Sequence, residues 1–273
     1  MASDEIFNYA RGLGMSEFGL RFTFEKGIAD ENRLGLYDAS VSLNGIARSL
    51  AITTHALVNG EIRTHGESAH GAKFFLLPSR KGSFIVDAAI WIGAAIGSGV
   101  VYDFIKYGFQ EAAGIGDDAE ERSRALQKRI EPTIGELPAT LESALSDVHR
   151  PIRQDNEMTI KVTRPRGEVL ITFDSSTASY LEPHVAVVDE PIVGNVTRYN
   201  TLSKWGKFYD RKQGRVISFF LQPTVSEYER SLITWSLHEN NLNHQGTLSL
   251  TATAVVTSND RIKRYNVSAV QQI

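Results

Sequence analysis

The sequence has no cysteine among its 273 residues. This absence excludes disulfide bonds, thiolate zinc sites and cysteine nucleophiles together. Residues 1–16 also lack the apolar stretch of a secretory signal peptide, and they carry Asp4 and Glu5. We therefore expect a cytoplasmic protein in which residues 1–16 are an appended segment.

Catalytic motifs are lacking as well. The chain has no G-x-S-x-G nucleophile elbow, and Asp38, Asp87 and Asp103 are not spaced as an acid–base pair. His238 and His244 do not have the spacing of a zinc-binding helix. The sequence thus predicts a non-enzymatic protein without catalytic residues, metal or cofactor, with an unrecognised hydrolase as an alternative.

Charge is distributed unevenly along the chain. Residues 191–273 contain ten Lys and Arg against five Asp and Glu, whereas residues 1–190 contain nineteen against twenty-seven. A basic module joined to an acidic one indicates an anionic partner for the C-terminal part. Ordinary variation in composition explains a surplus of this size equally well.

The N-terminal half alternates between strand and helix patterns. Alternating apolar residues predict a half-buried strand at 17–24, and apolar residues at three- and four-residue steps predict a helix at 36–58. The other expected elements of this half are two strands and two helices, at 72–77, 83–86, 117–129 and 139–148. The fold class is therefore α+β.

Residues 88–102 are fifteen uncharged residues between Asp87 and Asp103, and they predict a helix rich in glycine and alanine. Each helical glycine costs about 1 kcal/mol relative to alanine, so the run requires a compensating close contact. At about 1.5 Å per residue this helix is about 22 Å long, shorter than the roughly 30 Å core of a bilayer. We expect it in the protein core or in an oligomer that enters membrane. The residues proposed for that contact are Trp91, Gly93, Gly97 and Gly99.

The C-terminal part is rich in strand patterns. A hairpin is expected at 158–163 and 167–174. Three strands, a helix and two strands follow, at 192–199, 206–209, 216–221, 225–238, 247–256 and 262–270. That order is typical of a five-stranded OB-like barrel, and a split or SH3-like barrel fits it as well.

These patterns predict five successive parts of the chain. They are an appended segment 1–16, a β-α-β-β module 17–87, a helical region 88–150, a β-hairpin linker 151–190 and an OB-like barrel 191–273.

Cations and aromatic residues gather in the expected barrel. Aromatic rings stack on bases while cations contact phosphates, so this composition favours a single-stranded nucleic acid or an oligonucleotide as ligand. Simple alternation of inward and outward side chains, with no ligand, is the alternative. The predicted ligand-binding residues are Arg198, Lys204, Trp205, Lys207, Tyr209, Arg211, Lys212, Arg215, Arg261, Lys263 and Arg264.

Several short segments resemble a family of uncharacterised bacterial proteins. The similar segments are Tyr37-Asp38-Ala39, Ser42-Leu43, Ala51-Ile52-Thr53-Thr54-His55-Ala56, Lys81-Gly82-Ser83-Phe84, Gly206-Lys207-Phe208-Tyr209 and Lys263-Arg264-Tyr265. The resemblance implies the same strand–helix–strand–strand module, small-residue helix and C-terminal barrel. It also implies an origin in mobile elements or phage-defence neighbourhoods, and it supplies no known active site.

Together these observations predict an oligomeric anti-phage defence effector. Its small-residue helix would perturb or enter the inner membrane on activation, and its barrel would sense an oligonucleotide or single-stranded DNA. Its expected partners are further copies of itself, that ligand, the membrane and a protein from the same operon. The alternative is a soluble nucleic-acid-binding or scaffolding protein with the glycine-rich helix inside an oligomer core.

Overall fold

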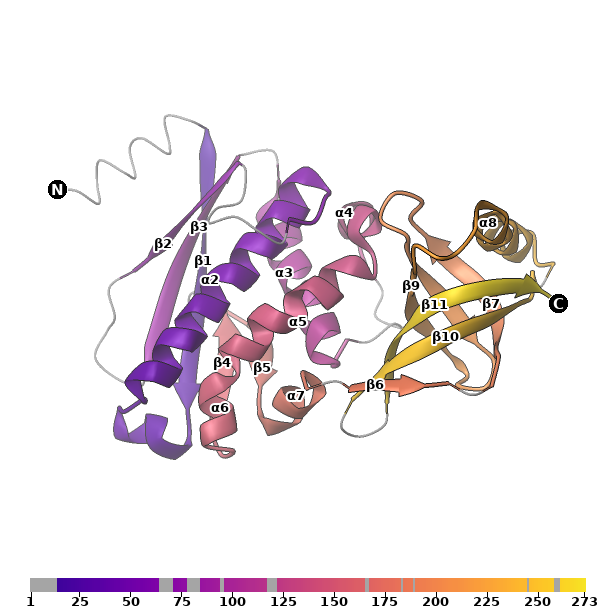
Figure 1. The fold of residues 1–273 in the computed structure, drawn as a ribbon. Coiled ribbons are helices and arrows are strands. Elements are labelled where there is room, and N and C mark those ends of the chain that lie inside the picture. Colours follow the sequence, from indigo (N-terminus) through magenta and orange to yellow (C-terminus); the bar gives the residue numbers. More distant parts are fainter. Residues whose placement is uncertain are drawn as a thin grey trace. The chain divides into compact units, whose positions relative to one another are not determined.

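The computed structural model describes residues 14–63, 71–77, 84–93, 96–116, 122–164, 167–182, 184–188, 190–244, 246–257 and 261–273. The chain forms two compact units (Figure 1). Met1–Pro132 with Leu137–Leu181 is here called the sheet unit, and Thr133–Glu136 with Glu182–Ile273 the barrel unit. Most of the appended segment, the expected turns at 78–82 and 258–260, and residues 117–121 of an expected helix lie outside the described residues. The α+β class is confirmed.

The sheet unit contains a five-stranded sheet in the order β2-β3-β1-β4-β5. Its strands are β1 Met15–Glu25, β2 Ala72–Leu76, β3 Ile85–Gly93, β4 Thr159–Thr163 and β5 Val169–Phe173. Along β1 burial alternates, because every second side chain points to the same face. The apolar residues at these alternate positions, Phe18, Leu20, Phe22 and Phe24, are all buried, as the sequence predicted.

Helices cover one face of this sheet (Figure 1). They are α2 Leu36–Asn59, α3 Ser98–Ala113, α4 Arg124–Ile130, α5 Glu136–Val148, α6 Arg150–Gln154 and α7 Ser175–Tyr180. Two 3-10 turns, Gly27–Glu31 and Glu131–Thr133, complete the set. Helix α2 ends at Gly60, whose φ of 69° is a left-handed conformation that glycine adopts without strain.

The predicted helix at 88–102 is wrong. Residues Ile85–Gly93 form β3, which lies between β2 and β1, and α3 begins only at Ser98. Nearly every residue of β3 is buried, including Trp91 at 2 % exposure, and its sequence is apolar except for Asp87, which pairs with Arg21. A run of this kind has no period that distinguishes a two-sided buried strand from a buried helix.

The three glycines assigned to a close helix contact also lie elsewhere. Gly93 ends β3, Gly97 caps α3, and Gly99 is in the first turn of α3. A Cβ atom added at any of them would meet no heavy atom within 4 Å. Over the described ranges, no helix combines the length and the apolar character that crossing a membrane requires. The single helix at 88–102 that the membrane hypothesis required is therefore replaced by a strand and the start of α3.

The hairpin assigned to a linker belongs to the sheet unit. Strand β4 pairs antiparallel with β1, and β5 pairs with β4. Residues that are far apart in sequence thus complete one sheet, which local patterning does not reveal. The boundary between the units lies after Leu181, within the predicted linker 151–190.

The barrel unit has the predicted OB-like order. Its strands are β6 His184–Val187, β7 Ile192–Tyr199, β8 Trp205–Asp210, β9 Arg215–Leu221, β10 Leu248–Val256 and β11 Ile262–Gln272, with α8 Glu227–Asn241 between β9 and β10. Strand β7 pairs with β8 and β10, β8 with β9, and β10 with β11, all antiparallel. Strand β9 pairs parallel with β11 and closes the barrel. Strand β6 adds to the edge of β10.

Candidate nucleic-acid interface

The outer surface of β8 and β9 carries the centre of the predicted ligand site. In OB-like barrels these second and third strands, with the loops beside them, form the usual ligand face. Along β8, Phe208 points into the core, whereas Trp205, Lys207 and Tyr209 point outward. Their neighbours on β9 are Phe220, Ser218 and Val216 in turn. We call these six residues and the outward cations beside them the outer face.

Cations form a row across the outer face. Arg198 on β7 lies opposite Lys207 on β8, and Lys207 lies opposite Ser218 on β9. Ser218 in turn lies opposite Arg264 on β11. Neighbouring strands are about 4.8 Å apart, so the row from Arg198 to Arg264 extends about 14 Å at the backbone. The sequence named all three cations, and the structure places them in one line.

Aromatic side chains lie on both sides of this row. The rings of Trp205 and Phe220 are 5.4 Å apart between centroids and tilted by 42°. Tyr209 lies two residues beyond Lys207 along β8 and is 38 % exposed. Two residues of strand cover about 6.8 Å, so aromatic, cation and aromatic follow one another at that interval.

Trp205 is partly covered from within the barrel unit. Residues Thr133–Glu136 belong to this unit, and a Cβ atom added to Gly135 would lie 3.4 Å from Cε3 of Trp205. The same segment includes Glu136, where burial raises the pKa of the carboxyl group. Of Trp205 and Tyr209, the two aromatic residues predicted to bind the ligand, Tyr209 is thus the more exposed.

The other predicted residues lie at the ends of the outer face. Lys204 precedes β8, and its Nζ donates to the carbonyl oxygen of Thr201 at 2.5 Å. At the opposite end, Arg211 Nη2 donates to Thr247 Oγ1 at 2.8 Å, and Arg215 Nη2 donates to the carbonyl oxygen of Ile262 at 2.6 Å. Arg261 and Lys263 lie at the start of β11, beside this second end.

Lys212 was predicted to bind the ligand, but in the structure it pairs with an acidic residue. It lies in the turn between β8 and β9, and its Nζ is 2.6 Å from Oε2 of Glu190. The hydrogen bond between them raises the pKa of the Lys212 ammonium and lowers the pKa of the Glu190 carboxyl. Lys212 therefore lies outside the cationic row.

A buried hydrogen-bond network supports the outer face from inside the barrel. The Tyr265 hydroxyl donates to Oδ2 of the buried Asp210 at 2.6 Å, and the Lys212 and Gln213 amides donate to Oδ1 at 2.8 and 3.1 Å. Burial and this carboxylate raise the pKa of Tyr265 above its usual value. The network fixes the turn between β8 and β9, and with it the direction of both strands.

Phe220 and Ser218 are members of the outer face that the sequence reasoning missed. The run Ser218-Phe219-Phe220-Leu221 has adjacent aromatic residues, and only the strand register tells which one points outward. The burial of Phe219 on the core side assigns Phe220 to the outside. The strict alternation along Ile217, Phe219 and Leu221 was the signal that could have found it.

An α+β unit followed by an OB-like barrel defines the class of this protein. Residues 20–182 match the model of a domain of unknown function, DUF7946, and residues 190–271 match a family of unknown function, DUF7947. The first match covers more than half of the chain, so the protein belongs to the DUF7946 family. The first match covers most of the sheet unit together with residues 133–136 and 182 of the barrel unit, and the second match lies within the barrel unit. No curated protein and no solved structure matches the chain significantly.

Proposed function

We propose that the barrel unit binds single-stranded nucleic acid on its outer face, as a binding module and not as an enzyme. The phosphates would follow the row of Arg198, Lys207 and Arg264. The bases would stack on Tyr209 and on the accessible part of the Trp205–Phe220 pair. The surplus of basic residues in 191–273 supports the same ligand through long-range attraction.

The observation that carries this proposal is the pairing of Arg198 with Lys207. The two residues are direct cross-strand neighbours on the outer face, so one anionic phosphate between them would meet two cations. A phosphate backbone supplies such anions repeatedly, and it also reaches Arg264 on the far side of Ser218.

The aromatic groups favour a single strand over a duplex. In a duplex the base faces are stacked on one another, whereas a single strand can turn its bases onto aromatic side chains. Each base stacked in this way contributes about 1–3 kcal/mol.

The sequence also predicted a defence effector controlled by an oligonucleotide. That role stays a prediction, and its ligand would be the one proposed here. Its membrane part depended on a helix at 88–102, which the structure replaces with β3 and the start of α3, so we do not carry that part forward. Self-association concerns several chains and likewise stays a prediction.

Fluorescence anisotropy with labelled oligo-dT, oligo-dA and a duplex of matched length tests the proposal. We expect both single strands to bind more tightly than the duplex at low salt. The logarithm of affinity should fall with the logarithm of salt concentration by about 0.7 for each phosphate contact. Lys207→Ala should lower that slope by about one contact, and Tyr209→Ala should cost about 1–3 kcal/mol of binding free energy.

Two matched variants make the result specific. Lys212→Ala removes the same charge outside the row and should bind as the wild type does. Arg198→Gln removes another cation of the row and should lower the salt slope by about one contact, as Lys207→Ala does. Equal losses for Lys212→Ala and Lys207→Ala, or no binding of either single strand at low salt, would refute the proposal.

A further inference from the structure

The turn between β7 and β8 carries the most exposed large apolar side chain among the described residues. Leu202, in the middle of this turn, is 90 % exposed. Turn positions are usually filled by Gly, Pro, Asn, Asp or Ser, which form the turn without exposing apolar surface. A single exposed leucine is common on proteins, so exposure alone does not mark a site. The hydrogen bonds of this turn and its place beside the outer face set Leu202 apart.

Hydrogen bonds fix the backbone on both sides of Leu202. Asn200 Oδ1 accepts from the Leu202 amide at 2.9 Å and from the Ser203 amide at 3.2 Å. The Lys204 amide donates to the Asn200 carbonyl oxygen at 3.0 Å, and Lys204 Nζ donates to the Thr201 carbonyl oxygen at 2.5 Å. The turn therefore presents its leucine on a backbone that is already ordered.

Lys204 ends the turn in a left-handed conformation. Its φ is 64°, in a region that residues other than glycine seldom occupy. Strained backbone of this kind persists where the surrounding structure holds it, and it is concentrated at binding and catalytic sites. Here the Asn200 amide donates to the Trp205 carbonyl oxygen at 2.8 Å, and the Leu221 amide donates to the Lys204 carbonyl oxygen at 3.1 Å. The turn is thus joined firmly to the start of β8.

Leu202 lies beyond one end of the outer face. The outward residues of β8 are Trp205, Lys207 and Tyr209 in chain order, and the turn immediately precedes Trp205. Phe220, opposite Trp205 on β9, lies at the same end. A single strand that stacks on Tyr209 and on the Trp205–Phe220 pair would therefore reach Leu202 at the end of its path over β8.

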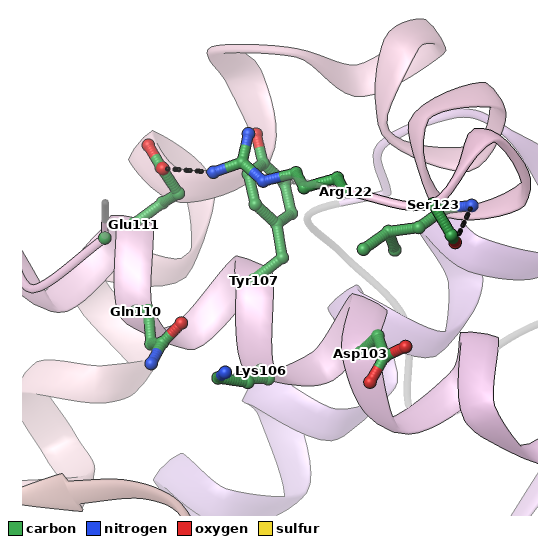
Figure 2. Close-up of a pocket in the computed structure, with 9 residues that line it drawn as sticks. Asp103, Lys106, Tyr107, Gln110, Glu111, Arg122 and Ser123 are labelled. Atoms are coloured by element: carbon green, nitrogen blue, oxygen red, sulfur yellow. Dashed lines mark hydrogen bonds and ion pairs between the residues drawn. The ribbon is translucent and has the colours of Figure 1, made fainter. Parts of the chain in front are cut away.

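The polar pocket between α3 and α4 in the sheet unit contrasts with this exposed turn. Arg122 Nη2 lies 3.3 Å from Glu111 Oε1, and the guanidinium carbon lies 4.8 Å from the centre of the Tyr107 ring (Figure 2). Asp103 Oδ1 accepts from Arg164 Nη2 at 3.5 Å. These charged side chains already have partners in the chain, whereas the Leu202 side chain is open to a ligand.

We propose that the barrel unit recognises the junction between a single strand and a duplex, with Leu202 as an apolar wedge against the last base pair. This proposal rests on the proposed binding of the single strand to the outer face. Apolar side chains such as leucine are known to insert at base steps and to contact the base faces that they unstack. An ordered turn suits this role, because it loses little conformational freedom on binding.

Fluorescence anisotropy of the full chain with labelled DNAs tests the proposal. The DNAs are a single strand, a blunt duplex, and duplexes that carry the same single strand as a 5′ or a 3′ tail. We expect one of the two tailed duplexes to bind about tenfold more tightly than the single strand, because the leucine side chain becomes buried at the junction. The other polarity should lack this gain, since the order from Leu202 to Tyr209 fixes the direction of the strand.

Matched variants separate the wedge from the attraction of the added phosphates. Leu202→Ala should abolish the preference for the tailed duplex and leave the affinity for the single strand unchanged, whereas Leu202→Met keeps an apolar wedge and should retain the preference. Leu36→Ala removes a leucine that is 88 % exposed in the sheet unit, and it should bind all four DNAs as the wild type does.

The outcomes distinguish this proposal from the proposed function. Failure of the single strand to bind at low salt would refute the proposed function, and the junction proposal with it. Binding of the single strand without a preference for either tailed duplex would overturn the junction proposal alone. A preference that persists in Leu202→Ala, or an equal loss for single strand and tailed duplex in that variant, would overturn it as well.

Discussion

Gly194 in the barrel unit and the glycine cluster after β3 in the sheet unit have opposite surroundings. In the barrel, isolated glycines permit close approach of strands: a Cβ atom at Gly194 would overlap the carbonyl oxygen of Tyr209 on β8. In the sheet unit, the densest glycine cluster lies where β3 passes into α3, and Gly93, Gly97 and Gly99 face open space. The density of glycine in a sequence therefore says little about where packing requires it.

The largest expected effect tests this contrast in the barrel. Gly194→Ala should lower the free energy of unfolding by about 3 kcal/mol or more, because the added methyl group collides with backbone and with the Phe208 ring. Chemical denaturation followed by Trp205 and Trp235 fluorescence measures it. Gly97→Ala is the control in the sheet unit and should change stability by less than about 1 kcal/mol. Similar losses for the two variants would remove the contrast.

The sequence predicted the barrel more accurately than the sheet unit for a physical reason. Each barrel strand has a core side and an outer side, so alternation along β7, β9 and β11 marks both the strand and its orientation. Strand β3 is buried on both sides and loses that alternation. Strands β4 and β5 look like a local hairpin, and only their pairing with β1 reveals their sheet.

The candidate site was predictable in composition but not in arrangement. Arg198, Lys207 and Arg264 could be named from the sequence, because cations and aromatics alternate there. Their alignment in one row depends on the register of four strands, including a bulge between Val196 and Arg198. Lys212 is also a lysine, but it lies in the turn between β8 and β9 and contacts Glu190.

A second prediction compares the acid sensitivity of the two units. His149 in the sheet unit is fully buried, with Nδ1 2.7 Å from the Leu145 carbonyl oxygen and Nε2 2.9 Å from Thr177 Oγ1. A carbonyl oxygen only accepts, so Nδ1 carries the hydrogen and the neutral ring accepts at Nε2. Burial lowers the pKa of His149 from 6.5 to about 4. The described histidines of the barrel unit, His184, His238 and His244, are exposed.

Stability should therefore fall as pH decreases from about 6.5 to about 4. In that window the unfolded chain binds a proton at His149 that the folded chain does not, so the unfolded state gains about 3 kcal/mol relative to the folded state. Urea denaturation at several pH values measures the slope. His149→Gln should be less stable at neutral pH and should lack this part of the pH dependence. The same slope in wild type and variant would contradict the assignment.

The smallest expected effect compares two helical glycines of the sheet unit and has opposite signs. Gly45 lies where α2 meets α5, and a Cβ atom there would be 2.6 Å from both the Ala144 carbonyl oxygen and the Val148 amide nitrogen. Gly45→Ala should therefore destabilise the protein by about 1–3 kcal/mol. Gly99→Ala meets no atom within 4 Å and replaces a flexible residue in the first turn of α3, so it should stabilise by up to about 1 kcal/mol. Thermal unfolding of both variants measures these changes. A loss of stability in Gly99→Ala would mean that the glycines after β3 do have a packing role. Unchanged stability in Gly45→Ala would mean that α2 and α5 can separate.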